Sequence, residues 1–194
     1  MLVPTVIVLA AGKGERFKAS GGADDKLNAL LCGQRVRDHV LAAVTASGLP
    51  CHVVEREHTA HLNNPGIGDS IACGVAATAQ AQGWLILPAD LPLIQSHTLL
   101  AVAQALQQHT VVVPFYQGQQ GHPVGFQRPC GAALMQLNGD KGARRVVAAH
   151  AVGRLELDDE GIVWDVDTVA LLTQAEERLK SRQPNQSDPN RSRV

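Results

Sequence analysis

The chain has 194 residues, of which 45% are hydrophobic, 18% charged and 3% aromatic, a composition typical of one compact soluble domain. Its formal net charge of −1 lacks the basic excess that binding along a nucleic-acid backbone requires, so we expect no nucleic-acid partner. No apolar run approaches the roughly 20 residues that span a bilayer, and the first residues lack a signal-peptide pattern. We therefore expect no membrane partner and a cytoplasmic location.

The predicted elements alternate between strand and helix. Apolar runs predict strands at 5–10, 51–55, 84–87 and 110–114, and helical spacing of apolar residues predicts helices at 35–47, 70–82 and 96–108. Downstream we expect strands at 124–126 and 153–157, and helices at 130–137, 141–150 and 168–180. This alternation indicates an α/β fold with a mostly parallel sheet covered on both faces, in which ligands bind at the carboxyl ends of the strands.

Residues 1–179 are predicted to form one domain and residues 180–194 a disordered tail. The tail contains four basic residues, one acidic residue and two prolines, and almost nothing apolar. Such a segment buries too little apolar surface to offset the entropy lost on ordering.

A glycine loop follows the first predicted strand. Gly12 and Gly14 would let backbone N–H groups surround an anion, and Lys13, Arg16 and Lys26 would neutralise phosphate oxygens. The third glycine of the dinucleotide fingerprint is absent, and so is the Lys-Ser/Thr pair of a P-loop. From the loop alone, an ordinary glycine turn with solvated basic residues remains the alternative.

Carboxylates occur at two other predicted loops. Asp90 follows the strand at 84–87 and is flanked by prolines, while Asp165 and Asp167 are two residues apart and would point to the same side of an extended segment. Carboxylate oxygens suit Mg²⁺, so Asp90 together with Asp165 or Asp167 is a candidate metal site. Turn formation and helix capping explain the same residues without a metal.

Seven segments follow one another along the chain: LAAGKGERF at 9–17, KLNAL at 26–30, GIGDSIACG at 66–74, LPADLPLI at 87–94, GHPVGF at 121–126, GDKGAR at 139–144 and DVDT at 165–168. Together they resemble the nucleotidyltransferases of the molybdenum-cofactor group, which join CTP or GTP to a phosphorylated pterin. The resemblance extends from residue 6 to about residue 179. It implies a three-layer αβα Rossmann-like nucleotidyltransferase fold of the glycosyltransferase-A type.

The resemblance also implies roles for individual residues. The nucleotide would be bound by Leu9, Ala10, Ala11, Gly12, Gly14, Arg16, Lys26 and Ser70. Arg16, Lys26 and Asp90 would be catalytic, Asp90 and Asp167 would bind Mg²⁺, and the acceptor side would contain His122, Pro123, Gly139, Asp140 and Arg144. The implied partners are a nucleoside triphosphate and a phosphorylated small molecule such as the molybdenum cofactor, and the role also allows a molybdoenzyme or its chaperone as a protein partner.

The choice of base depends on two positions. Ala11 is more similar to the CTP-using members than to the GTP-using members, which have glycine there, so CTP is favoured and GTP is the alternative. Ile67 and Asp69 depart from the family, which usually has a methionine and a run of serines. Asp69 would either accept a hydrogen bond from a base amino group or repel the phosphates.

Other functions compete with this interpretation. A sugar-phosphate nucleotidyltransferase would need the same nucleotide half, and a non-catalytic nucleotide-binding protein would keep the fold without the reaction. Gly68 to Ile71 also contains the start of a serine-esterase signature with Ser70 as nucleophile, although no DxxH follows. His58 and His61, with Cys51, His52 and Cys73 nearby in sequence, suggest zinc, but their spacing fits no standard site and solvated histidines are favoured.

Overall fold

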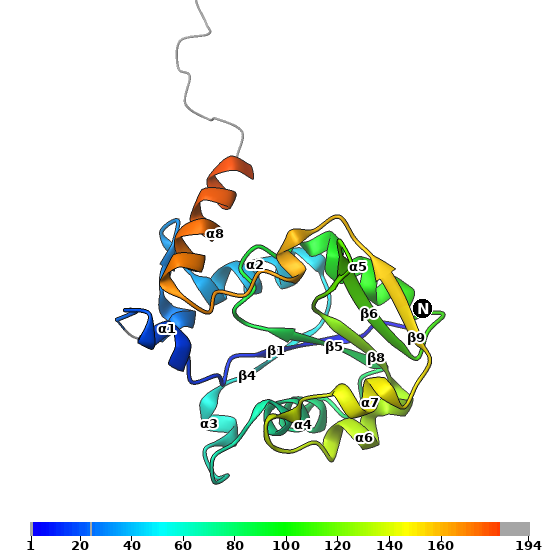
Figure 1. Cartoon of the computed structure of the whole chain (residues 1–194). Helices are drawn as coiled ribbons and strands as arrows, with labels where there is room; N and C mark the ends of the chain where they lie inside the picture. Colours follow the sequence, from blue (N-terminus) through cyan, green and yellow to red (C-terminus); the bar gives the residue numbers. More distant parts are fainter. Residues whose placement is uncertain (1, 24, 183–194) are drawn as a thin grey trace, which may run out of the picture.

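The computed structural model describes residues 2–23 and 25–182, and places a central sheet between two layers of helices (Figure 1). Among these residues, no helix is both long and apolar enough to span a bilayer. The predicted α/β class and the mostly parallel sheet are confirmed.

The main sheet has the strand order β4-β1-β5-β8-β6-β7, and β9 pairs with β6. β1 is parallel to β4 and β5, and β6 is parallel to β9, whereas β8 runs antiparallel between β5 and β6. The strands are β1 (Thr5–Leu9), β4 (Cys51–Val54), β5 (Gly83–Pro88), β6 (Val111–Tyr116), β7 (Gln119–Gln120), β8 (Val124–Gln127) and β9 (Val152–Glu156). A separate hairpin joins β2 (Leu30–Leu31) to β3 (Gln34–Arg35).

Helices cover both faces because the central strands are apolar on both sides. In β1, Val6 and Val8 pack on one core cluster with α2 and α5, and Ile7 packs on the other with α4, α6 and α7 (Figure 1). These helices are α2 (Val36–Ser47), α5 (Ser96–Ala105), α4 (Ile67–Ala77), α6 (Gly131–Met135) and α7 (Arg144–Ala148).

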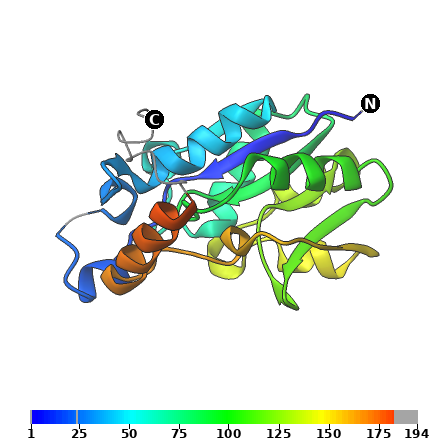
Figure 2. The ribbon, with the colours of Figure 1, turned by 90° about the horizontal axis from the view of Figure 1, so that it is seen from above.

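Three helices lie near the carboxyl ends of β1, β4 and β5: α1 (Glu15–Ala19), α3 (Arg56–Thr59) and α8 (Val169–Arg182). Viewed from above, α8 lies beside α1 (Figure 2), and Phe17 and Ala175 belong to one small apolar cluster between them. Four short 3₁₀ turns complete the described elements: η1 (Lys26–Asn28), η2 (Arg128–Cys130), η3 (Gly139–Lys141) and η4 (Glu160–Ile162).

Several predicted boundaries were wrong. Helix α4 begins at Ile67 instead of residue 70, because Gly68 stays helical despite its low helix propensity. It ends at Ala77 instead of residue 82. The helix expected at 141–150 is limited to α7, since the chain before it turns through Gly142 at a positive φ of 55°. Helix α1 and the β2–β3 hairpin lie in segments where we expected no regular structure.

The boundary of the predicted tail was also wrong by three residues. Helix α8 continues through Lys180 to Arg182, whose guanidinium donates to the Leu93 carbonyl at 2.7 Å and pairs with Glu160 at 3.3 Å. These contacts hold the last turn of α8 in place, although the residues of that turn are polar. The rest of the predicted tail, 183–194, lies outside the described residues.

Candidate active site

The glycine loop forms one wall of a cavity of about 660 Å³ at the carboxyl edge of the sheet. Gly14 has φ 63° and ψ 29°, a left-handed conformation that suits glycine, and it turns the chain from β1 into α1. Within residues 2–23 and 25–182, the backbone N–H groups of 11–14 donate no intramolecular hydrogen bond. The loop therefore offers free backbone donors beside the cavity, as anion binding requires.

Two contacts hold the glycine loop in place. The Lys13 Nζ donates to Asn64 Oδ1 at 2.6 Å, which joins the loop to the opposite wall of the cavity. The Arg56 guanidinium donates to the Gly12 carbonyl and pairs with Asp25 at 3.0 Å. Lys13 is thus used within the protein, while the Arg16 side chain is 81% exposed.

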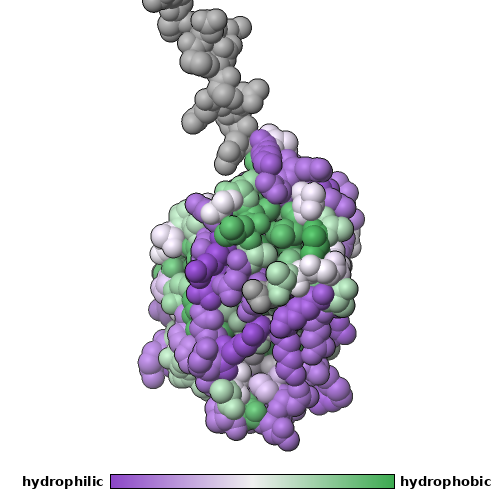
Figure 3. Space-filling model, turned by 90° about the vertical axis from the view of Figure 1, so that its left-hand side faces the viewer, coloured by the Kyte–Doolittle hydropathy of each residue, from purple (hydrophilic) through white to green (hydrophobic). Residues whose placement is uncertain are grey.

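Four charged side chains from distant parts of the sequence meet at this edge. The Lys26 Nζ donates to Asp90 Oδ2 at 2.5 Å and to Asp167 Oδ1 at 2.7 Å. The Arg16 guanidinium pairs with the other oxygen of Asp167 at 2.5 Å. The side chains of Lys26, Asp90 and Asp167 are only 12–17% exposed. Figure 3 faces this edge and shows hydrophilic residues over most of it, with an apolar area in its upper part.

Backbone pairing explains why these segments converge. Beyond the paired strands, the Ala89 N–H donates to the Leu9 carbonyl at 3.1 Å, so the chain carrying Asp90 stays beside the end of β1. The Val166 N–H donates to the Asp90 carbonyl at 2.9 Å, which brings Asp167 next to Asp90 just before α8 begins. The carboxylates are therefore positioned by the sheet edge and not by flexible loops.

The charges in the cluster shift one another's titration. Burial lowers the pKa of Lys26, but Asp90 and Asp167 outweigh this effect and raise the pKa overall. Burial raises the pKa of Asp167, but the hydrogen bond and charge of Lys26 and the charge of Arg16 lower it overall. Burial, together with the charges of Asp167 and Asp90, raises the pKa of Asp165. Asp167 is therefore the more strongly ionised of the two neighbouring carboxylates.

The residues present suit a divalent cation. Within the described part of the chain, Asp90 Oδ1 is buried and has no hydrogen-bond partner. Asp90 and Asp167 border the glycine-loop cavity and, with Asp165, a smaller cavity of about 340 Å³ beside it. Hard carboxylate oxygens that face a cavity, one of them without a donor, are the ligand type that Mg²⁺ and Mn²⁺ prefer.

A second cavity of about 750 Å³ lies between the amino-terminal end of β8 and α7. Apolar side chains such as Ile71 and Phe126 form its wall, and His122, Asp140, Lys141 and Arg144 supply its polar groups. Burial lowers the pKa of His122 despite the nearby charge of Asp90, which favours the neutral imidazole. Of the predicted acceptor residues, Pro123 and Gly139 do not border this cavity.

Most predicted nucleotide residues border the first cavity, but Ala10 does not. Leu9, Ala11, Gly12, Gly14 and Ser70 line it. The Ala10 side chain is buried in the core, and its N–H donates to the Val54 carbonyl at 2.9 Å directly after the end of β1.

The contacts of the described residues do not support three of the alternative interpretations. Ser70 Oγ donates to the Gly66 carbonyl at 3.3 Å in its own helix, and no histidine among the described residues bonds it, so an esterase triad is not formed. Among the described residues, no group of three or more His, Cys, Asp or Glu side chains is placed to hold a metal ion, so the His and Cys residues form no zinc site and the aspartates form no complete site by themselves. Asp69 borders none of the three cavities, and its Oδ2 accepts hydrogen bonds from the backbone N–H groups of Gly66 and Gly139.

Sequence reasoning missed two residues that shape the first cavity, Arg56 and Asn64. Both follow β4, whose carboxyl end lies beside that of β1. A basic residue directly after a predicted parallel strand is the signal that would have identified Arg56. Asn64 lies in a polar segment without a comparable signal.

Comparison with known proteins agrees with this geometry. Residues 6–155 match the family model described as the MobA-like NTP transferase domain. The purine catabolism protein PucB of Bacillus subtilis (strain 168) is 29% identical over 191 aligned positions, covering 84% of this chain and 90% of PucB.

Solved structures share the fold at lower identity. Rv0371c from Mycobacterium tuberculosis H37Rv is 23% identical with a TM-score of 0.75, covering 91% of this chain and 98% of that one. A second structure of that protein is described as a complex with manganese. Molybdopterin-guanine dinucleotide biosynthesis protein A from Archaeoglobus fulgidus is 16% identical with a TM-score of 0.62, and the match covers 91% of this chain and 99% of that one. The family model covers most of the chain and the fold agrees, so this protein is a nucleotidyltransferase that belongs to the MobA-like NTP transferase family.

Proposed function

We propose that the protein transfers CMP from CTP to the phosphate of the molybdenum cofactor or of a similar phosphorylated small molecule. The observation that carries the proposal is the cluster of Arg16, Lys26, Asp90 and Asp167 beside a glycine loop with free backbone donors. The names of the relatives, which include a molybdopterin-guanine dinucleotide protein, support the acceptor class.

In the proposed reaction, a phosphate oxygen of the acceptor attacks the α-phosphorus of the nucleotide. A new P–O bond forms, the bond to the β-phosphate breaks, and pyrophosphate leaves with the electron pair. Negative charge develops on the α-phosphate oxygens and on the leaving group, so cations and in-line positioning supply the catalysis. No nucleophile from the protein is needed.

Substrate binding would exchange the partners within the cluster. In the structure, Lys26 and Arg16 are paired with carboxylates, so their charges are already neutralised. Asp90 and Asp167 would hold a divalent cation, Mg²⁺ in this proposal, whose chemistry is to neutralise charge on the phosphates. Lys26 and Arg16 would then turn to the triphosphate, and the glycine-loop N–H groups would bind its remaining oxygens.

The second cavity is the proposed acceptor site. Its apolar wall suits a flat ring system, and Lys141 and Arg144 supply cationic groups that suit a phosphate. His122 borders both this cavity and the small cavity shared by Asp90 and Asp167, so an acceptor bound there would present its phosphate toward the α-phosphorus. Arg144 and Asp140 are the proposed rim contacts.

The proposal is tested by pyrophosphate release from CTP, GTP, ATP and UTP with Mg²⁺ and either the molybdenum cofactor or a sugar phosphate. We expect release that requires the cofactor and is fastest with CTP, because Ala11 resembles the CTP-using members. Faster release with GTP would overturn the choice of base, and release with sugar phosphates alone would overturn the acceptor. The variant Asp158→Ala is a suitable control, because Asp158 is exposed and lies outside the three cavities.

A further inference from the structure

The walls of the two large cavities touch each other at the start of α4. Ile67 and Asp140 border both cavities. The two backbones approach closely here because Gly66 and Gly68 flank Ile67 and Gly139 precedes Asp140. A Cβ on Gly66 would lie 2.3 Å from the Gly139 carbonyl carbon, and a Cβ on Gly68 would lie 2.8 Å from the Asn138 oxygen. Side chains at Gly66 or Gly68 would therefore push residues 138–140 away from α4.

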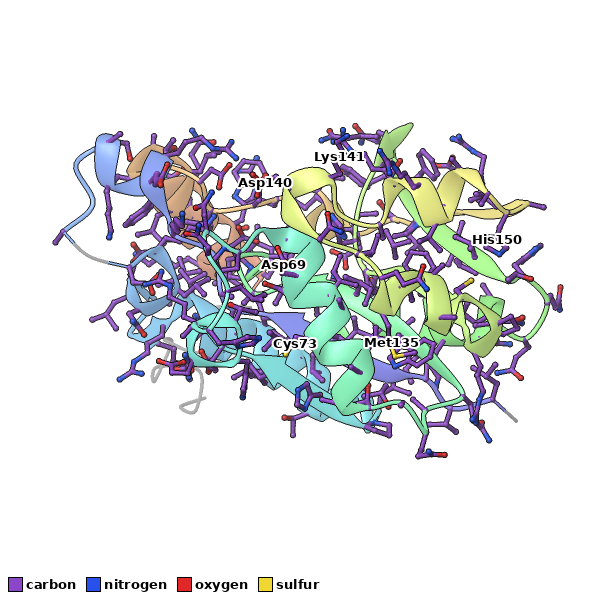
Figure 4. The ribbon with its side chains drawn as sticks, turned by 90° about the horizontal axis from the view of Figure 1, so that it is seen from below. Asp69, Cys73, Met135, Asp140, Lys141 and His150 are labelled. Carbon is purple, nitrogen blue, oxygen red and sulfur yellow. The ribbon has the colours of Figure 1, made fainter. Side chains whose placement is uncertain are left out.

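One carboxylate holds this contact. Asp69 Oδ2 accepts the N–H of Gly66 at 2.8 Å and the N–H of Gly139 at 2.9 Å, two residues far apart in the sequence. Figure 4 shows Asp69 at the start of α4, next to the turn that carries Asp140. Among the described residues, no other hydrogen bond joins residues 138–142 to another element.

Apolar side chains anchor the segment that Asp69 holds at its two ends, and between them its backbone lies against Gly66 and Gly68. Leu137 and Ala143 pack against the core on either side of it, whereas Asp140 and Lys141 between them are exposed. Gly139 and Gly142 have positive φ values of 61° and 55°, conformations that glycine adopts freely. Among the described residues, the hydrogen bond to Asp69 is thus the one polar contact that keeps this backbone against α4.

We propose that Asp69 is a positioning residue that fixes the acceptor-side segment 138–142 against the nucleotide-side helix α4 and so sets the spacing of the two substrates. This inference rests on the proposed function. Asp69 borders neither large cavity, so it acts through Gly139 and not by touching a substrate. Because in-line transfer depends strongly on the alignment of the reacting atoms, a loose segment lowers the rate of transfer more than it lowers nucleotide binding.

The chain contains a matched control for this residue. Asp38 occupies the third position of α2, as Asp69 does in α4, so both carboxylates lie in the first turn of a helix. Asp38 is 47% exposed and its nearest cation is the Arg37 guanidinium at 3.9 Å. Asp38→Ala removes the same charge from the same helical position without releasing any distant segment.

The first experiment follows the segment itself. Trypsin cleavage after Lys141 in the folded protein is expected to be about tenfold faster in Asp69→Ala than in the wild type. Asp69→Asn keeps an acceptor oxygen and is expected to remain within about threefold of the wild type, as is Asp38→Ala. Unchanged cleavage in Asp69→Ala would overturn the proposal, whatever the activity of the enzyme.

The second experiment separates alignment from nucleotide binding. In Asp69→Ala, kcat/KM for the acceptor is expected to fall by about 10- to 100-fold, while the Kd for CTP stays within about twofold and Asp69→Asn restores the rate. An equal loss of CTP affinity would show that Asp69 contacts the nucleotide and would overturn the proposal. If the wild type transfers to no acceptor, the proposed function fails, and the cleavage experiment still decides the role of Asp69.

Discussion

Two carboxylates of this protein, the partly buried Asp90 and the buried Asp159, differ in their surroundings. Asp159 is 1% exposed, and both of its oxygens accept hydrogen bonds: from the Thr98 hydroxyl at 2.6 Å, the Gln95 N–H at 3.2 Å and side-chain amide at 3.3 Å, and the Gly161 N–H at 2.9 Å. The Arg182 guanidinium lies 3.9 Å from one of these oxygens. Asp90 pairs with the Lys26 ammonium, and its other oxygen, among the described residues, has no partner. A fully bonded carboxylate stabilises the fold, whereas one that keeps a free oxygen beside a cavity is available to a ligand.

The largest expected effect is on turnover. Asp90→Asn should lower kcat by about 10³-fold, because it weakens a metal ligand at the reacting phosphates. The melting temperature should change little, since Lys26 keeps its bond to Asp167. Steady-state kinetics and thermal unfolding of the same preparation test both statements. A variant with wild-type turnover would show that Asp90 resembles Asp159 in role.

The second effect is on stability. Asp159→Ala should lower the free energy of unfolding by about 3 kcal/mol, because it leaves the donors of Thr98, Gln95 and Gly161 without their acceptor in a buried place. Urea denaturation measures this loss. The exposed neighbour variant Asp158→Ala should change stability by less than about 0.5 kcal/mol. A folded Asp159→Ala enzyme should keep the kcat of the wild type, and a large loss of kcat would break the comparison.

A smaller effect concerns how the Asp90 and Asp167 carboxylates respond to a metal ion. Lys26→Met leaves Asp90 and Asp167 without their shared cation, which should cost about 2 kcal/mol, less than a fully buried pair because Arg16 remains. Addition of Mn²⁺ should raise the melting temperature of Lys26→Met more than that of the wild type. An equal shift in both proteins would contradict a metal site at these carboxylates.

The smallest effect concerns pH. Burial lowers the pKa of His122 below the ordinary value of 6.5, so the unfolded chain binds a proton more readily than the folded one. The stability of the wild type should therefore fall as the pH is lowered from about 7 to 5. His122→Gln should weaken this dependence in urea titrations at several pH values. Identical slopes for the two proteins would show that His122 keeps an ordinary pKa.

The order of the elements could be predicted from the sequence because each central strand is an uninterrupted apolar run. The run around Ile7 requires cover on both faces, and the helices at Val40 and Ile71 supply it. Short elements were missed because their stability comes from contacts, not from pattern: α1 depends on Phe17 packing near α8, and the last turn of α8 depends on Arg182 binding Glu160.

The charged cluster could be predicted in part. The strand ends place Asp90 near the glycine loop, but local sequence does not show that Asp167 lies there too, and the resemblance supplied that pairing. The role of Asp69 could not be deduced, because a carboxylate in a base-side segment suits several partners. Only the backbone approach of Gly139 to Gly66 decides among them.

The reversed direction of β8 has a consequence for how the protein can vary. Parallel β4, β1 and β5 end in the loops that carry the nucleotide-side groups, whereas β8 begins at the same edge, just after His122. Under the proposed function, the acceptor would meet the groups that precede β8 and those of α7, although Leu9, Ile86 and Pro88 of the other half of the sheet also line the second cavity. Sequence changes just before β8 and in α7 would then alter acceptor choice with the least effect on the glycine loop.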